Sequence, residues 1–335
     1  MPAEWWPHTR CWMAWPSRKD IWGSCLAQVK KDVAAVAQAI AAFESVSLIA
    51  PPASVAEAKQ ACGGHVEVIA LPIDDCWTRD TGPTFLVNDK DGCAGISWGF
   101  NGWGEKYQQP NNYKDDALLA RRLLGELKLL AFAGPLVIEG GNLCVDGEGT
   151  LLTSETALLN PNRNPYLQRG DVEEHLGAYL GVEKVIWLPG NPADTVTDGH
   201  VDGIACFCRP GVVIMDTIQD KNDPECKDLE ACRQVLAAAT DARGRKLKVL
   251  TLMRPREAPS DAEDFCSSYL NFYIADGGIV MPKFGDEKAD EAARQVVAEA
   301  FPDRRVVQLP IDAIAEGGGE IHCITQQQPS GRKPA

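Results

Sequence analysis

The sequence has no run of about 18 consecutive apolar residues, the length that a helix needs to cross a membrane. Its first residues also lack a basic stretch followed by an apolar one, so no secretory signal is visible. We therefore expect no membrane partner and a cytoplasmic location. The twelve cysteines include no C-x-x-C pair, which argues against a zinc finger. Without a secretory signal, they are expected to be reduced thiols and not disulfides.

Positive charge is scarce as well. The chain has 33 Lys and Arg against 47 Asp and Glu, which gives a net charge of −14. Nucleic acid is therefore a poor partner, because phosphate binding requires a basic surface. A small cationic substrate would be attracted by such a charge, although an acidic surface that only maintains solubility is the simpler interpretation.

Apolar runs alternate with helical patterns along the 335 residues, and no linker rich in Pro, Gly or Ser divides the chain. We expect one domain over residues 1–329 and a short polar tail over 330–335. Helices are predicted at 20–43, 114–130, 169–180, 225–240 and 287–300. Strands are predicted at 45–50, 65–72, 136–146, 149–154, 184–189, 211–216, 247–252, 271–285 and 305–310. The recurring order of strand, Gly-rich turn, strand and helix indicates an α/β fold of repeated ββαβ-type units.

The stretch TDGHVD (197–202) contains one of only five histidines. If it is extended, Asp198, His200 and Asp202 share one face, and the acids raise the pKa of the histidine. A solvated turn around Asp198 is the alternative. A manganese ureohydrolase also uses an Asp-x-His-x-Asp run, but it needs a second acid-rich motif that this sequence lacks. We therefore predict no metal site.

Two further acids follow apolar runs. Asp80 lies in WTRDTGP, at the end of a strand-like segment, where it either braces the turn or reaches a functional site. Glu139 precedes two glycines in IEGGN and is either a surface residue or an acid directed into a cleft. These segments by themselves do not decide between the alternatives.

Cys323 lies in GGGEIHCITQQQP, after a triple glycine at 317–319. The adjacent His322 is a poor candidate for its base, because neighbouring side chains point in different directions in a strand or a helix. His200 is the better candidate. The glycines allow the backbone to approach a ligand closely, whereas an inert buried thiol remains the alternative.

Taken together, these segments resemble the agmatine deiminases and the related bacterial peptidyl-arginine deiminases, which belong to the guanidine-modifying pentein superfamily. The matching motifs occur in the same order over nearly the whole chain: PAEWWPHTRCWMAWP, WTRDTGPTF, IEGGN, LLNPNRNP, WLPG, DGHVD, DARGRK, SSYLNFYIADGGIVMPKFGD and GGGEIHCITQQQP. The resemblance implies a five-bladed α/β propeller of pseudo-symmetric ββαβ units. A homodimer would be ordinary for the family.

The resemblance also implies roles for individual residues. Cys323 matches the nucleophile and His200 the general acid and base, and Glu139 belongs with this catalytic group. Carboxylates suit a guanidinium, which is a planar, cationic fork of N–H donors. The residues expected to contact the substrate are Asp80, Asp202, Trp77, Asp198, Glu320 and Gly319. No metal or organic cofactor is implied.

The sequence departs from the family where the tail of the substrate would bind. Val196 stands where an acid usually receives the amine of agmatine, Gly203 replaces Asn or Glu, and Glu320 replaces Asn or Gly. The segment 104–116 is compressed. We expect deimination of agmatine, with another guanidino compound as the alternative and a non-catalytic guanidino-binding protein as a weaker one. Asp194 is a possible substitute for the missing acid at Val196.

Overall fold

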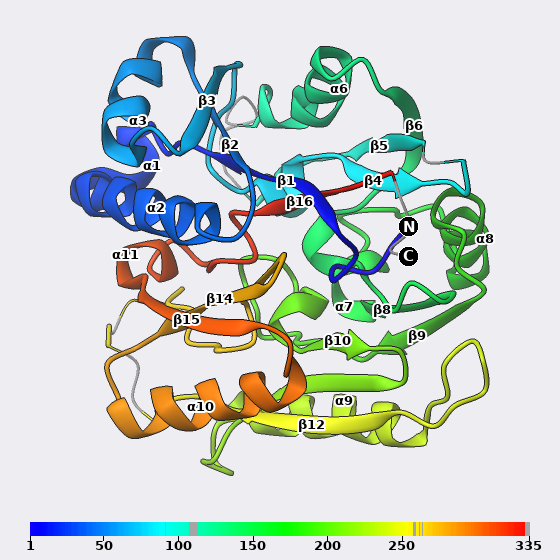
Figure 1. The fold of residues 1–335 in the computed structure, drawn as a ribbon. Helices are drawn as coiled ribbons and strands as arrows, with labels where there is room; N and C mark the ends of the chain where they lie inside the picture. The colour runs from blue at the N-terminus through cyan, green and yellow to red at the C-terminus, as the bar shows by residue number, and fades with distance from the viewer. Residues whose placement is uncertain (91, 107–112, 257–258, 261, 263, 332–335) are drawn as a thin grey trace.

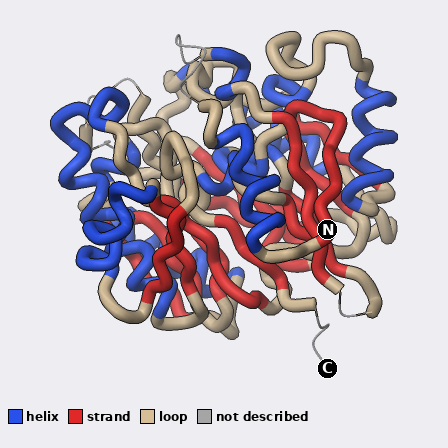
Figure 2. Tube along the Cα trace, turned by 90° about the horizontal axis from the view of Figure 1, so that it is seen from above, coloured by secondary structure: helices blue, strands red, loops and turns tan. Residues whose placement is uncertain are grey.

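The computed structural model describes residues 1–335 except 91, 107–112, 257–258, 261, 263 and 332–335, and these residues form five β-sheets. Figure 1 places the longer helices at the periphery, and Figure 2, seen from above, shows strands running through the interior between flanking helices. No helix in this part of the chain is long and apolar enough to cross a membrane.

Four sheets have three strands each and share one plan. An antiparallel pair is followed by a helix, which leads to a third strand parallel to the second. The four units are β4 (Thr84–Val87), β5 (Cys93–Gly99), α6 (Asp116–Glu126) and β6 (Leu130–Val137); β7 (Cys144–Val145), β8 (Thr150–Ser154), α8 (Arg169–Leu180) and β9 (Lys184–Leu188); β10 (Ala205–Arg209), β11 (Val212–Thr217), α9 (Pro224–Ala238) and β12 (Lys248–Met253); β13 (Tyr273–Ala275), β14 (Gly278–Lys283), α10 (Glu287–Ala300) and β15 (Arg305–Pro310).

The fifth sheet joins the two ends of the chain. Its order is β16 (Gln326–Pro329), β1 (His8–Ala14), β2 (Val46–Ala50) and β3 (Val66–Ala70), and β16 is antiparallel to β1 while the other pairs are parallel. Helices α2 (Leu26–Ala41) and α3 (Val55–Cys62) belong to this part of the chain (Figure 1). All five residues of β2 are buried, as expected of a strand covered on both faces.

Short helical segments complete the fold. They are α1 (Lys19–Trp22), α4 (Thr78–Thr81), α5 (Gly102–Glu105), α7 (Glu155–Leu158), α11 (Asp312–Ala315) and the 3-10 turns η1 (Gly23–Cys25), η2 (Pro52–Ser54), η3 (Gly140–Asn142) and η4 (Val201–Gly203). Of these, α4, η3 and η4 carry residues of the candidate site.

The α/β class and the ββαβ order are confirmed, and the predicted helices at 169–180 and 287–300 match α8 and α10. The predicted helix at 20–43 is wrong in its continuity. It is broken at Gly23, whose φ of 52° leaves the right-handed helical region. The single strand predicted at 136–146 is also wrong, because β6 ends at Val137 and η3 intervenes before β7. The strand prediction also missed β1, β4, β5, β10 and β16. Most of the tail predicted at 330–335 lies outside the described residues, as do positions 107–112 of the segment 104–116.

Candidate active site

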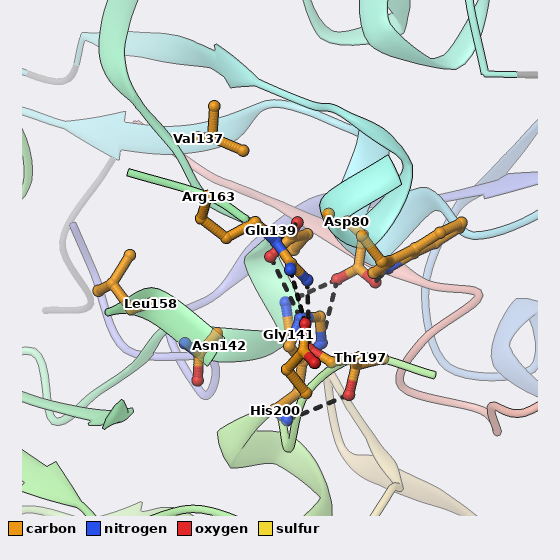
Figure 3. A network of polar contacts seen from close by, with 12 residues as sticks. Asp80, Val137, Glu139, Gly141, Asn142, Leu158, Arg163, Thr197 and His200 are labelled. Atoms are coloured by element: carbon orange, nitrogen blue, oxygen red, sulfur yellow. Dashed lines mark hydrogen bonds and ion pairs between the residues drawn. The ribbon is translucent and has the colours of Figure 1, made fainter. Parts of the chain in front are cut away.

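The loop between β6 and β7 brings Glu139 next to a histidine and two other acids. The backbone N–H of Gly141 donates to Asp80 Oδ1 at 2.8 Å. A Cβ atom on Gly141 would lie 2.6 Å from His200 Nδ1, 2.9 Å from Asp80 Oδ1 and 3.0 Å from Asp202 Oδ2. Only glycine therefore lets these three side chains, which come from α4 and the loop at η4, meet at this point. Figure 3 shows Gly141 with Asp80 and His200.

His200 is buried among carboxylates. Its Nε2 lies 3.3 Å from Glu139 Oε2, and its Nδ1 lies 3.8 Å from Asp80 Oδ1. Burial alone would lower the pKa of His200, but Asp80 and Glu139 raise it to about 9. The ring therefore carries a proton at neutral pH. Burial raises the pKa of Asp80, whereas the pKa of Glu139 is lowered because His200 and Arg163 outweigh its burial.

Arg163 is a member of this network that sequence reasoning did not assign. Its Nε donates to Glu139 Oε1 at 2.7 Å and its Nη2 to the carbonyl oxygen of Thr197 at 3.2 Å, and the guanidinium is fully buried (Figure 3). It thus holds both the carboxylate beside His200 and the loop that carries the histidine. The sequence feature that could have indicated Arg163 is the motif LLNPNRNP, in which it is the only basic residue.

Asp198 lies apart from the other acids, and its predicted contact with the substrate stays a prediction. The stretch 197–202 is a turn followed by η4 and is not extended, and Asp198 has a φ of 67°. Its carboxylate pairs with Arg163 Nη1 and with Lys106 Nζ, each at 2.7 Å. The turn therefore places the Asp198 carboxylate between two cations.

Cys323 lies in the turn before β16, half-buried. Its Sγ is 3.4 Å from Asn271 Oδ1 and 3.8 Å from Asp202 Oδ2, and its N–H also contacts Asn271 Oδ1 at 3.3 Å. Burial first, and then Asp202 and Asp80, raise the pKa of the thiol well above its ordinary range. The sulfur is therefore protonated in the free protein and lies beside acids that would attract a cation.

Trp77 and Gly319 lie on the other side of this cysteine. A Cβ atom on Gly319 would come within 2.4 Å of the Trp77 ring and 3.2 Å of Cys323 Cβ. Trp77 is buried, and its Nε1 donates to Asp75 Oδ2 at 3.1 Å. Gly319 therefore lets the indole pack close to the sulfur.

A cavity of about 730 Å³ opens beside the sulfur. Cys323, His200, Asp202, Gly319 and Glu320 line it, as do two of the positions where the sequence departs from the family, Val196 and Gly203. Asp80, Glu139 and Trp77 are not among the lining residues and lie behind it, against His200 or Gly319.

The acids that line this cavity differ in the hydrogen bonds that they already accept from the protein. Asp194 accepts hydrogen bonds from the N–H groups of Val196, Thr197 and Gly199 and from the Thr197 hydroxyl. Its carboxylate therefore stabilises the loop in which it lies. This makes it a poor substitute for an acid at Val196. Glu320 is buried and accepts one hydrogen bond, from the Ser268 N–H to Oε1 at 2.8 Å. Burial raises the pKa of Glu320 well above its ordinary value.

The manganese alternative is not supported by this geometry, because Asp198 faces Arg163 and Lys106 while His200 faces Glu139 and Asp80. The residues of the described chain whose possible ligand atoms gather within 4.8 Å are His8, Glu44 and Asp276. These three already satisfy one another, since His8 Nδ1 lies 2.9 Å from Glu44 Oε2 and the His8 N–H donates to Asp276.

An α/β fold of ββαβ units with a cysteine, a histidine and acids gathered at strand ends defines a pentein-type hydrolase that acts on C–N bonds of guanidino or related amidine groups. The chain belongs to the Porphyromonas-type peptidyl-arginine deiminase family, whose model matches residues 1–329.

Similar proteins carry a more specific description. A putative agmatine deiminase of Legionella pneumophila strain Philadelphia 1 is 46% identical, with 99% of this chain and 95% of the relative covered. An agmatine deiminase of Pseudomonas aeruginosa strain LESB58 is 41% identical, with 99% and 96% covered. The structure of the Enterococcus faecalis agmatine deiminase has a TM-score of 0.94 and is 34% identical, with 99% of this chain and 96% of that chain covered.

Proposed function

We propose that the protein hydrolyses agmatine to N-carbamoylputrescine and ammonia. The observation that carries this proposal is the convergence of His200, Glu139, Asp80 and Asp202 beside the sulfur of Cys323, in a chain 40–46% identical to named or putative agmatine deiminases. Asp202, which lines the cavity, supplies an acceptor for a guanidinium, and Asp80 and Glu139 behind it add negative charge.

Substrate charge provides the activation that the free protein lacks. Asp202 and Asp80 hold the pKa of Cys323 high, and a guanidinium bound against them offsets their charge. The pKa of the thiol then falls and the thiolate forms next to the guanidinium carbon. In this way the nucleophile is generated only when a cation occupies the site.

The reaction then follows two steps. The thiolate adds to the central carbon, and His200, protonated in the free protein, gives its proton to the departing ammonia. This leaves an S-alkylthiouronium on Cys323 and a neutral imidazole. The imidazole takes a proton from water, and the resulting hydroxide adds to the same carbon. The thiolate then leaves and takes up the proton of the added hydroxyl group, which restores the thiol and releases the neutral ureido product. Arg163 and Glu139 keep the ring in place through both steps.

An assay of the products tests this proposal. Purified protein with agmatine is expected to release one ammonia per ureido product, identified by mass, and Cys323→Ala is expected to abolish turnover. Cys266→Ala is the matched control, because this second cysteine also lines the cavity but has no assigned role. Full activity in Cys323→Ala would contradict the mechanism. Urea as the product would indicate a ureohydrolase, and binding without products would indicate a binding protein.

The blade number, the compartment and the oligomeric state are part of the same proposal. Five sheets, four of them ββαβ units, support a five-bladed propeller formed by a single catalytic domain over residues 1–329. Twelve unpaired cysteines support a reducing compartment such as the cytoplasm. A homodimer is supported by β6, which exposes Leu130 and Phe132 and carries no charged residue.

A further inference from the structure

Behind Asp202 lies a line of buried charged side chains that reaches the first residues of the chain. Asp202 Oδ2 is 2.8 Å from His322 Nδ1, and His322 Nε2 is 2.9 Å from Glu4 Oε1. The same Glu4 oxygen lies 3.3 Å from Arg79 Nη1. These four residues are at most 9% exposed, and they come from four segments distant in sequence.

The contacts of His322 determine its protonation. Both ring nitrogens face carboxylate oxygens, which only accept hydrogen bonds, so both nitrogens must donate and the ring is an imidazolium. Burial and Arg79 lower the pKa of His322, but Glu4 and Asp202 outweigh them and raise it. For Asp202, the effect of His322 outweighs burial and lowers the pKa of the carboxyl. His322 thus keeps Asp202 ionised although it is buried.

The N-terminal segment is held so that Glu4 stays in this position. His8 Nε2 lies 2.9 Å from the carbonyl oxygen of Glu4, and His8 Nδ1 lies 2.9 Å from Glu44 Oε2. Tyr273 donates to the other oxygen of Glu44 at 2.8 Å. The backbone at Glu4 is therefore tied to β1 and, through Glu44, to β13.

We propose that Glu4 and His322 are positioning residues that hold Asp202 as an ionised carboxylate directed at the guanidinium beside Cys323. The side chain of Glu4 then supports the active site from behind, although it touches neither the sulfur nor the cavity. This inference rests on the proposed deiminase function. It assigns His322 a role other than general base for the adjacent Cys323.

Two charge-removing variants test the proposal. In His322→Gln, Asp202 loses its cationic partner, so its pKa rises. KM for agmatine should increase about tenfold or more with a smaller change in kcat, and the acid limb of kcat/KM should move up by about one pH unit or more. In Glu4→Gln, the imidazolium loses one of its two anions, so its pKa falls. KM should then increase as pH rises through this lowered pKa and return toward the wild-type value at acidic pH.

Trp6→Phe is the matched control. It removes the hydrogen bond from Trp6 Nε1 to the carbonyl oxygen of Ser330, 2.9 Å long, and so loosens the same segment without changing a charge. It should keep the wild-type KM and pH profile. KM and the position of a pH limb do not depend on how much enzyme is folded, so a lower melting temperature in any variant leaves the comparison valid.

Nitrogen-15 NMR of labelled histidines provides a measurement that needs no substrate. The signals of His322, assigned by their loss in His322→Gln, should show both ring nitrogens of the wild type protonated to a higher pH than those of a free histidine. A ring that loses its proton at or below the pH at which a free histidine does, or wild-type KM and pH profiles in both charge variants, would overturn the inference. Failure of the wild-type protein to turn over agmatine would instead overturn the proposed function, while the protonation of His322 would still be decided by NMR.

Discussion

At the scale of single residues, Cys323 differs from the other cysteines by its neighbours and not by its chemistry. Burial raises the pKa of several of these thiols, including Cys11 and Cys144. Cys323 is distinguished because Asp202 lies against its sulfur and Asp80 also contributes to its raised pKa. Cys11 and Cys144 also lie near an acid, Glu44 and Glu4, but neither thiol lines the cavity, whereas a cation bound in the cavity can lower the pKa of Cys323. Selectivity among the thiols therefore requires carboxylates that a bound cation can reach.

Glu320 is the residue whose change should alter the recognition of the tail and not the chemistry. It is a buried acid that lines the cavity with Cys323 and accepts a single hydrogen bond, whereas Val196 offers an ammonium no partner. We predict that Glu320→Gln raises KM for agmatine about tenfold or more. The ammonium of the substrate lowers the raised pKa of the buried carboxyl and so forms a charge-assisted contact that the amide cannot form.

n-Butylguanidine, which has the same chain length but no amine, serves as the control substrate. Its kcat/KM should be nearly the same in Glu320→Gln and in the wild type, as measured by ammonia release. An equal loss for both substrates would show that Glu320 supports the cysteine, and no loss for either would remove it from the specificity argument.

At the scale of elements, the loop over η3 shows how a site is built where a strand stops. Adding a methyl group at Gly141 would force it against His200, Asp80 and Asp202. We predict that Gly141→Ala lowers kcat/KM at least about a hundredfold, because misplacing catalytic groups by a fraction of an ångström is costly. Steady-state ammonia release and thermal unfolding would be measured together.

Gly125→Ala is the matched substitution, because a Cβ there meets no atom within 4 Å and the residue lies in α6. Gly125 lies in the last turn of α6, where alanine is favoured over glycine by less than the about 1 kcal/mol of a helix interior, so this variant should be at least as stable and fully active. If Gly141→Ala kept wild-type activity, the close convergence at η3 would not be a requirement of the site.

Some elements and site residues could be predicted from the sequence, and others could not. Helices α8 and α10 were placed at their observed bounds, because local periodicity and capping determine them. Cys323, His200 and Glu139 were singled out from motif order, and the structure places the last two in contact. The contacts of Asp198 with Arg163 and of Glu4 with His322 span 35 and 318 positions, so no local pattern could predict them. Strand β1 was not predicted either, and it pairs both with β2 and with β16 at the other end of the chain.

At the scale of the whole molecule, the pairing of β16 with β1 closes the chain and carries the site with it. Cys323 lies three residues before β16, and its carbonyl oxygen accepts the Arg79 N–H at 3.1 Å. Within β16, Gln328 Oε1 accepts the Trp12 indole N–H at 2.9 Å, and Gln326 Nε2 donates to the carbonyl oxygen of Pro83 at 3.1 Å. These buried polar groups would lose their partners if the strand were absent.

Two truncated chains distinguish the contribution of β16 from that of the polar tail. A chain that ends at Thr325 should lose cooperative thermal unfolding and ammonia release together, because β1 is left with an open edge and the turn carrying Cys323 is no longer tied to the fifth sheet. A chain that ends at Gly331 keeps β16 and the Ser330 N–H donated to the Pro7 carbonyl oxygen, so its melting temperature and kcat should match those of the full chain. Differential scanning calorimetry with a parallel activity assay would distinguish the two. If the chain ending at Thr325 unfolded like the full protein, the site would be held by α4, η3 and η4 alone, and the closure of the fifth sheet would have no part in placing the nucleophile.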